Sequence, residues 1–228
     1  CDLMKYAKVE KINITLRDGN YDYHVLTIND PCSNESEIPD SVTSIGEYAF
    51  EGASLTSLTL GSGLKTIARR AFWQTDLTSL TIPDSVTVLS DMAFGDTPLK
   101  TLVIGKGLEN QSSVGRDVFL NVCQTLESVN IDAPKALGTY GQYSSNFLRR
   151  DGQQVYYYGY SGLHFGRFYD DTNNYNTTAY QCPKLEAITL GDNVITVGNN
   201  AFDAYQDFSV HLCNHVSCLF WNGVWPVC

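Results

Sequence analysis

Side chains of the kinds that bind metal ions lie close together near the end of the sequence. His211, Cys213 and His215 alternate along an expected strand and therefore share one face, and Cys218 follows three residues later. Two imidazoles and two thiolates can hold a tetrahedral zinc ion. The spacing matches no common zinc motif, however, and Cys228 offers a disulfide partner instead. We therefore predict no metal site.

The residue spacings that mark common enzyme active sites are missing. The sequence contains no G-x-S-x-G, no phosphate-binding loop and no H-E-x-x-H. Asp170, Asp171, Asn173 and Asn174 carry oxygens of the kind that bind calcium, but they lack the D-x-D/N-x-D/N order of a calcium loop and suit a polar loop tip. We predict no catalytic residue and no cofactor, and we do not expect an enzyme.

Cysteine usage indicates the cellular compartment. The seven cysteines are Cys1, Cys32, Cys123, Cys182, Cys213, Cys218 and Cys228. The first two flank an expected hairpin, the next two flank an irregular segment, and three lie in the last 16 residues. Such positions favour disulfides in a secreted or cell-surface protein. Because the number is odd, one cysteine is free, bonded to another chain or paired outside this sequence.

Sequons for N-glycosylation are compatible with the same compartment. They lie at Asn13, Asn34, Asn110 and Asn176. Four is close to the number that chance would give, but the last three fall in expected loops, where a glycan can be accommodated. Asn13 lies on an expected hairpin and is accessible only if its strand register allows.

Net charge excludes two classes of partner. The 228 residues include 15 basic and 25 acidic side chains, which gives a formal charge of −10. Nucleic acids and anionic lipids need a clustered basic surface, and the sequence has none. It also lacks any stretch near the roughly 20 apolar residues that span a bilayer.

The elements that position these residues are repeats. The six-residue segments that begin at Leu55, Leu77, Leu99, Leu126 and Leu185 share a leucine-rich pattern, LTSLTL in the first case. Ala-Phe pairs recur at the same phase, and Phe50, Phe72 and Phe94 are spaced 22 residues apart. Two independent markers with one period indicate a solenoid.

Each repeat can be divided into a turn, a short strand, a brief helical stretch, a loop and a second strand. The turn is IPDSV at Ile38 and Ile82, or a glycine pair such as Gly61 and Gly63. Each unit buries its leucine, isoleucine and phenylalanine only against its neighbours, so we expect a parallel solenoid with one continuous core. The unit from Ile104 to Ile131 is longer than the others.

The pattern IPDSVTSIGEYAFEGASLTSLTL at 38–60 resembles the BspA-like leucine-rich repeat, which occurs in surface proteins of bacteria and protists. The resemblance implies an α/β-type solenoid with a parallel sheet, and a role in adhesion or extracellular binding. It does not name a ligand. We divide the chain into a hairpin cap (1–37), repeats of about 22 residues (38–131), a tyrosine-rich insertion (132–183), a final repeat (184–212) and a cysteine-containing end (213–228).

The insertion is the most aromatic part of the sequence. Its expected ligand-binding residues are Tyr156, Tyr157, Tyr158, Tyr160, Phe165 and Tyr169. Insertions in solenoids often map to the binding face, and tyrosine is common in binding sites. Alternatively, these rings form a small core within the insertion and cover the solenoid.

The outward positions of the expected strands are mostly polar and β-branched. They are Thr27, Thr59, Thr81, Val103, Asn130 and Thr189. A regular array of this kind can bind ice or a crystalline polysaccharide, but it also suits the solvated side of any sheet.

Two functions remain open from the sequence. The first is an extracellular recognition module that binds a protein or glycan through the sheet and the insertion. The second is a structural subunit of a surface coat or filament, in which stacked ends and the odd cysteine support self-association.

Overall fold

The computed structural model describes the backbone of four main segments and several short pieces: 35–138, 141–148, 154–165 and 184–198, with 13–14, 23–24, 201, 210–211 and 217–218. It describes the side chains of residues 37–138, 161–165, 184–198 and 201.

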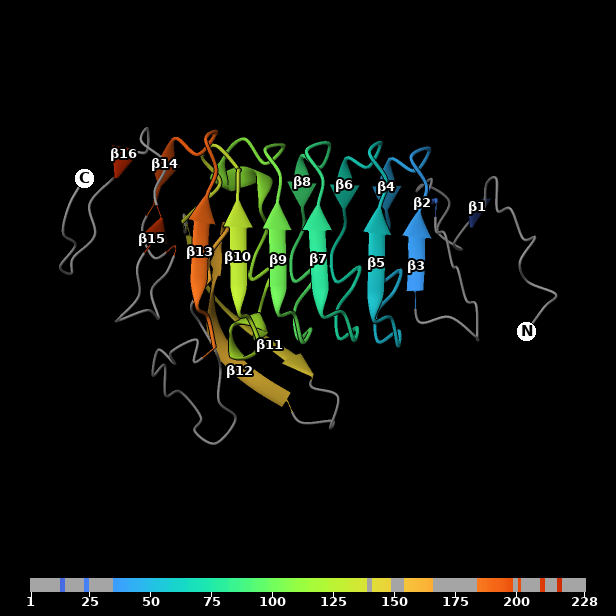
Figure 1. Ribbon diagram of the computed structural model, residues 1–228. Coiled ribbons are helices and arrows are strands. Elements are labelled where there is room, and N and C mark those ends of the chain that lie inside the picture. Colours follow the sequence, from blue (N-terminus) through green and yellow to red (C-terminus); the bar gives the residue numbers. More distant parts are fainter. Residues whose placement is uncertain are drawn as a thin grey trace.

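One wall of the molecule is a row of short parallel strands, called here the main sheet (Figure 1). Its strands are β3 (Glu35–Ile38), β5 (Ser57–Leu60), β7 (Ser79–Ile82), β9 (Thr101–Ile104), β10 (Ser128–Ile131), β13 (Ala187–Leu190) and β15 (Val210–His211). Strands β7 to β15 are hydrogen-bonded in this order, and β3 pairs with β5, which lies beside β7 (Figure 1). Thr81 lies opposite Val103, and Val103 lies opposite Asn130. The predicted parallel solenoid is confirmed.

A second row of still shorter strands forms the opposite wall. It contains β4 (Ser44–Ile45), β6 (Thr66–Ile67), β8 (Val88–Leu89), β14 (Thr196–Val197) and β16 (Ser217–Cys218). β4, β6 and β8 pair in parallel, as do β14 and β16. A bridge from Leu89 to Val114 extends the row into the next coil. The two walls enclose the predicted core, in which Leu58, Leu80 and Leu102 are buried.

A turn, rather than the expected helical stretch, precedes each Ala-Phe pair. Tyr48, Arg70 and Met92 occupy this position in successive coils and have φ angles of 59°, 52° and 56°. A positive φ interrupts a right-handed helix, so the helical prediction is wrong here. Within the described residues the helices are two short 3₁₀ turns, η1 (Gln111–Ser113) and η2 (Val122–Gln124), which absorb the extra length of the fourth unit. None of these helices has the length and apolar character needed to cross a membrane.

A stack of phenylalanine rings runs through the core along the solenoid axis. The ring centroids of Phe50 and Phe72 are 4.9 Å apart, and those of Phe72 and Phe94 are 5.1 Å apart, with interplanar angles of 2° and 3°. Phe119 continues the stack at 5.8 Å from Phe94. The 22-residue period therefore places one ring per coil at the same height.

The solenoid continues into the segment predicted as an insertion. The backbone N–H that follows each short strand donates to the preceding coil, as from Gly115 to the carbonyl of Leu89 at 2.7 Å. Gly198 donates in the same way to Leu137 at 3.0 Å. Leu137 therefore occupies the short-strand position of a fifth coil, and residues 132–138 belong to the solenoid.

The same coil is completed after a long excursion. Phe165 stacks on Phe119 with centroids 5.6 Å apart, and its N–H donates to Ala201 at 2.8 Å, as Phe72 donates to Ala93. Residues 161–165 thus return to the wall and supply the fifth aromatic ring. The predicted insertion is an interrupted repeat, and its boundaries of 132–183 include coil residues at 132–138 and 161–165.

Two antiparallel strand pairs lie outside this parallel pattern. β1 (Asn13–Ile14) pairs with β2 (Tyr23–His24) in the region predicted as a hairpin cap. β11 (Gly141–Leu148) pairs with β12 (Gln154–Ser161) over eight residues each, and in Figure 1 this pair extends past the lower ends of the main strands. The capping role of the first pair stays a prediction.

Candidate functional site

The outward side of the main sheet is a surface without charged or aromatic side chains over five strands. It consists of Ser57, Thr59, Ser79, Thr81, Thr101, Val103, Ser128, Asn130, Ala187 and Thr189, called here the strand face. All ten are exposed or half-buried because side chains alternate between the two sides of each strand. Strands spaced about 4.8 Å apart make this surface regular in both directions. Thr27, the first expected member, lies outside the described residues.

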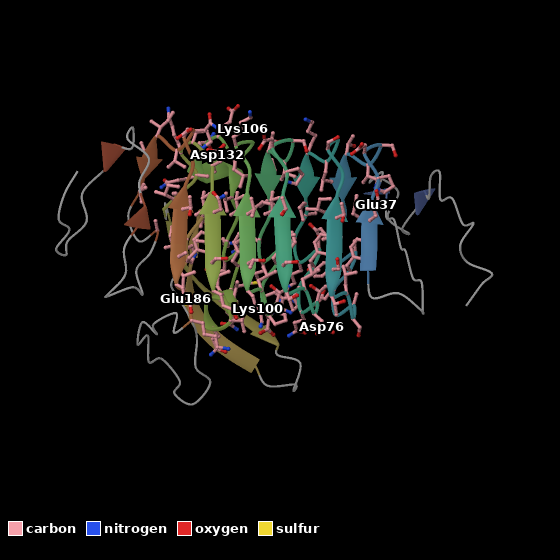
Figure 2. The ribbon with its side chains drawn as sticks, viewed as in Figure 1. Glu37, Asp76, Lys100, Lys106, Asp132 and Glu186 are labelled. Carbon is pink, nitrogen blue, oxygen red and sulfur yellow. The ribbon has the colours of Figure 1, made fainter. Side chains whose placement is uncertain are left out.

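Charged side chains lie along both edges of the strand face (Figure 2). At the upper edge, the Lys106 Nζ lies 3.5 Å from the Asp84 Oδ2, and Asp132 stands one corner further along. At the lower edge, the Lys100 Nζ lies 3.5 Å from the Glu127 Oε1. The site is therefore an uncharged centre between two charged rims.

The upper rim is held by hydrogen bonds between successive corners. Asp84 accepts from the backbone N–H of Lys106 at 3.1 Å, and Asp132 accepts from that of Asn193 at 3.0 Å. A Cβ on Gly105 would lie 2.7 Å from the backbone nitrogen of Asp84, so only glycine fits beside this aspartate. The sequence predicts the corner glycines, whereas the hydrogen bonds from each corner to the aspartate of the preceding corner are seen only in the stacked coils.

The equivalent aspartate of the first corner, Asp40, has a shifted pKa because of its hydrogen bonds. Asp40 accepts from the Ser62 N–H at 2.6 Å and from its hydroxyl at 2.9 Å, and these bonds lower the pKa of Asp40 below its ordinary 3.8. Both bonds favour the charged carboxylate over the neutral acid. They therefore stabilise the fold at pH values above the unfolded-state pKa of Asp40. This contribution is lost as the pH falls through the lower folded-state pKa.

Replacing Ser62 with alanine is expected to raise the pKa of Asp40 part of the way towards its ordinary value. The hydroxyl bond is lost, but the N–H bond, which is the larger cause of the shift, remains. Carbon-detected NMR titration of the Asp40 carboxyl in the native chain and in the variant would measure this change. An unchanged pKa would show that the hydroxyl does not contribute.

Four of the expected ligand-binding tyrosines lie in one strand. Tyr156, Tyr157, Tyr158 and Tyr160 belong to β12, which pairs with β11, but their side chains lie outside the described residues, so their role in binding stays a prediction. Tyr169 lies outside the described residues. Phe165 is 3% exposed and stacks in the core, so we correct the expectation that it contacts a ligand.

Comparison with known proteins identifies the repeat. The model of the BspA type leucine rich repeat region matches residues 29–147 and 157–219 with six copies. The chain belongs to the BspA-type leucine-rich repeat family. A crystal structure of a leucine-rich repeat protein from Bacteroides ovatus is similar at 19% identity and a TM-score of 0.46, covering 89% of this chain and 44% of that one. No curated protein matches.

Family membership gives a general expectation of function. Leucine-rich repeat proteins are generally protein-binding modules and typically lack catalytic activity. BspA-type proteins are typically bacterial surface proteins. The uncharged strand face lies on the wall that all the repeats of this chain build together.

A buried contact between a histidine and an aspartate was not predicted from the sequence of this BspA-type chain. The His164 Nε2 lies 3.4 Å from the Asp117 Oδ1, and both side chains are largely buried. His164 precedes Phe165 at the position where Ala71 and Ala93 precede their phenylalanines. Because the Ala-Phe marker is absent here, no sequence pattern indicated this contact, which joins the returning segment to the fourth coil.

The remaining expected sites are only partly within the described residues. Cys123 is buried in η2 and disulfide-bonded, and the side chains of the other six cysteines are not described. Asn110 is exposed at the start of η1, where its side-chain oxygen accepts from the hydroxyl of Ser112. Asn13 lies in β1, and the other two sequons lie outside the described residues.

The zinc ligands considered from the sequence do not share one strand. His211 lies in β15 of the main sheet, whereas Cys218 lies in β16, which pairs with β14 on the opposite wall. Cys213 and His215 lie outside the described residues. Among the side chains that are described, no group of three acidic, histidine or cysteine residues is placed to hold a metal ion.

Proposed function

We infer that this chain is a secreted or cell-surface recognition module that binds an extracellular protein through the strand face. The observation that carries this inference is the uncharged centre between charged rims. The centres of protein interfaces are depleted of charged residues, whereas their rims are polar and accessible to solvent. Threonine and serine hydroxyls at regular spacing add hydrogen-bonding groups to that centre.

The size of the strand face limits how such a partner can bind. Five strands at about 4.8 Å and four residues at about 3.3 Å give a surface of roughly 24 by 13 Å, or about 300 Å². A stable interface takes about 800 Å² from each partner. A partner of this chain must therefore also cover the rims and reach a neighbouring surface, and β11–β12 extends past the lower rim (Figure 1).

Introducing arginine in the middle of the strand face is expected to weaken partner binding at least tenfold. Thr81→Arg and Thr101→Arg each place a charge in the part of the interface that must lose its water, while folding is unaffected because both positions are exposed. Candidate partners would come from a panel of purified extracellular-matrix proteins, and affinity would be measured by surface plasmon resonance.

The matched control for this experiment is Val88→Arg, which adds the same charge to the exposed side of β8 on the opposite wall. Equal loss of binding in all three variants would count against the strand face as the contact surface. Light scattering of the same native sample, with and without reductant, tests the other candidate. A reductant-sensitive multimer that binds no partner would favour a structural subunit of a surface coat or filament.

A further inference from the structure

Acidic side chains outnumber basic ones around the strand face. The border of this face is taken here as the charged residues that lie within a main-sheet strand or up to three residues from its ends, among those whose side chains are described. The acidic members are Glu37, Asp40, Asp76, Asp84, Glu127, Asp132, Glu186 and Asp192, and the basic members are Lys100, Lys106 and Lys184. The border therefore carries a negative net charge, in keeping with the formal charge of −10 of the whole chain.

Two of the lysines are already paired with carboxylates of the same rim. Lys100 pairs with Glu127 on the lower rim, and Lys106 pairs with Asp84 on the upper rim, each at 3.5 Å. Each pair is close to neutral when seen from a distance, so the remaining carboxylates determine the sign of the charge on both rims.

Three of these remaining carboxylates lie on different sides of the strand face (Figure 2). Glu37 lies opposite Thr59 in the register of β3 and β5, so it stands at one end of the row of outward positions. Asp132 follows β10 at the upper rim, and Glu186 precedes β13 at the lower rim. The uncharged centre is thus bordered by negative charge along its length and at one end.

The strand face is narrow enough for these charges to act across all of it. Four residues at about 3.3 Å each place the two rims about 13 Å apart, so the centre lies about 7 Å from either rim. Salt screens charges over about 8 Å at physiological ionic strength. A negative potential therefore extends over the uncharged centre, and it attracts a positively charged protein surface and repels a negatively charged one.

We propose that the strand face selects a cationic extracellular protein, whose contact surface has an uncharged centre surrounded by lysine or arginine side chains. The proposal rests on the recognition function inferred above and specifies the partner of that same surface. Opposite charges at the rims accelerate the encounter of the two proteins, and like charges exclude acidic proteins. The uncharged centre supplies the contact that loses its water on binding.

The test compares two double variants of the full chain that change its net charge equally. Glu37→Gln/Glu186→Gln removes two carboxylates at the strand face. Glu47→Gln/Glu109→Gln is the matched control, because these glutamates follow β4 and precede η1, away from the strand face. All four side chains are exposed, so folding is expected to be unaffected. Surface plasmon resonance would measure association and dissociation rates against the panel of purified extracellular-matrix proteins, sorted into basic and acidic members by isoelectric point, at about 30 mM and about 300 mM sodium chloride.

We expect the binding proteins to be basic members of the panel. Their association rate should fall about tenfold or more between the lower and the higher salt concentration. At the lower salt concentration it should fall about three- to tenfold in Glu37→Gln/Glu186→Gln and less than about twofold in the control, with little change in the dissociation rate.

Two results would overturn the proposal and leave the recognition function standing. The first is an acidic protein that binds the native chain and loses affinity for Thr81→Arg. The second is equal slowing of association in the two double variants. Absence of binding by every member of the panel, or binding that Thr81→Arg leaves unchanged, would overturn the proposal and the recognition function together.

Discussion

Replacing Phe72 with alanine is expected to destabilise the solenoid by about 3–5 kcal/mol, the range found for large aromatic side chains in well-packed cores. Phe72 is 0% exposed and lies between two nearly parallel rings, those of Phe50 and Phe94. Its removal leaves a cavity that neither neighbour can fill, because each is fixed by its own coil. It also ends the aromatic stack, so the coils on either side lose part of their coupling.

Urea unfolding followed by circular dichroism would measure this loss. Val103→Ala on the strand face is the matched control, since Val103 is 39% exposed and its truncation should change the free energy of unfolding by less than about 0.5 kcal/mol. A loss below about 1 kcal/mol for Phe72→Ala would contradict a stabilising role of the aromatic stack between coils.

The second large effect is expected for Gly95→Ala. A Cβ at this position would lie 2.6 Å from Cε3 of Trp73 and closer still to Cζ3. Trp73 is 1% exposed, and the guanidinium of Arg70 lies 4.9 Å from its ring centroid, so the indole has no free space to move into. Overpacking of a core costs about 1–3 kcal/mol, and we expect the upper end of this range.

A double variant can show whether the loss of stability comes from the clash with the Trp73 indole or from replacing a glycine as such. In the double variant Trp73→Leu/Gly95→Ala the smaller side chain makes room for the methyl group, so the two substitutions should together cost less than the sum of the single losses. Gly52→Asn is the control, because Gly52 has φ +69° with open space around it, and Asn121 holds the equivalent position at φ 65°. Purely additive losses would show that the indole is not the obstacle.

The regular part of the fold could be predicted because its physical determinants repeat. Phe50, Phe72 and Phe94 share one period, and the strands alternate inward aliphatic residues with outward residues that are mostly threonine or serine, so the coil length and the core follow directly. The turns before the phenylalanines could not be predicted in the same way. Bulky residues such as Tyr48 and Met92 disfavour positive φ, and their backbone N–H groups are held there by hydrogen bonds to the carbonyls of the next coil.

The interrupted coil was missed because its markers are separated in the sequence. Leu137 and Phe165 belong to one turn of the solenoid, but Phe165 follows a histidine instead of an alanine and stands far from its expected position. The outward positions of the strand face, by contrast, follow from the alternation of side chains along each strand, which can be seen in the sequence.

The way the fifth coil closes bears on how such a protein can acquire new specificities. Leu137 and Leu163 are bridged to each other, and Gly138 donates to Leu163 at 2.7 Å, so the segment between them leaves and re-enters the wall at neighbouring points. Its length and composition can change in evolution without altering the path of the coil. This position therefore suits the insertion or exchange of loops, because the repeats on either side supply the stability of the fold.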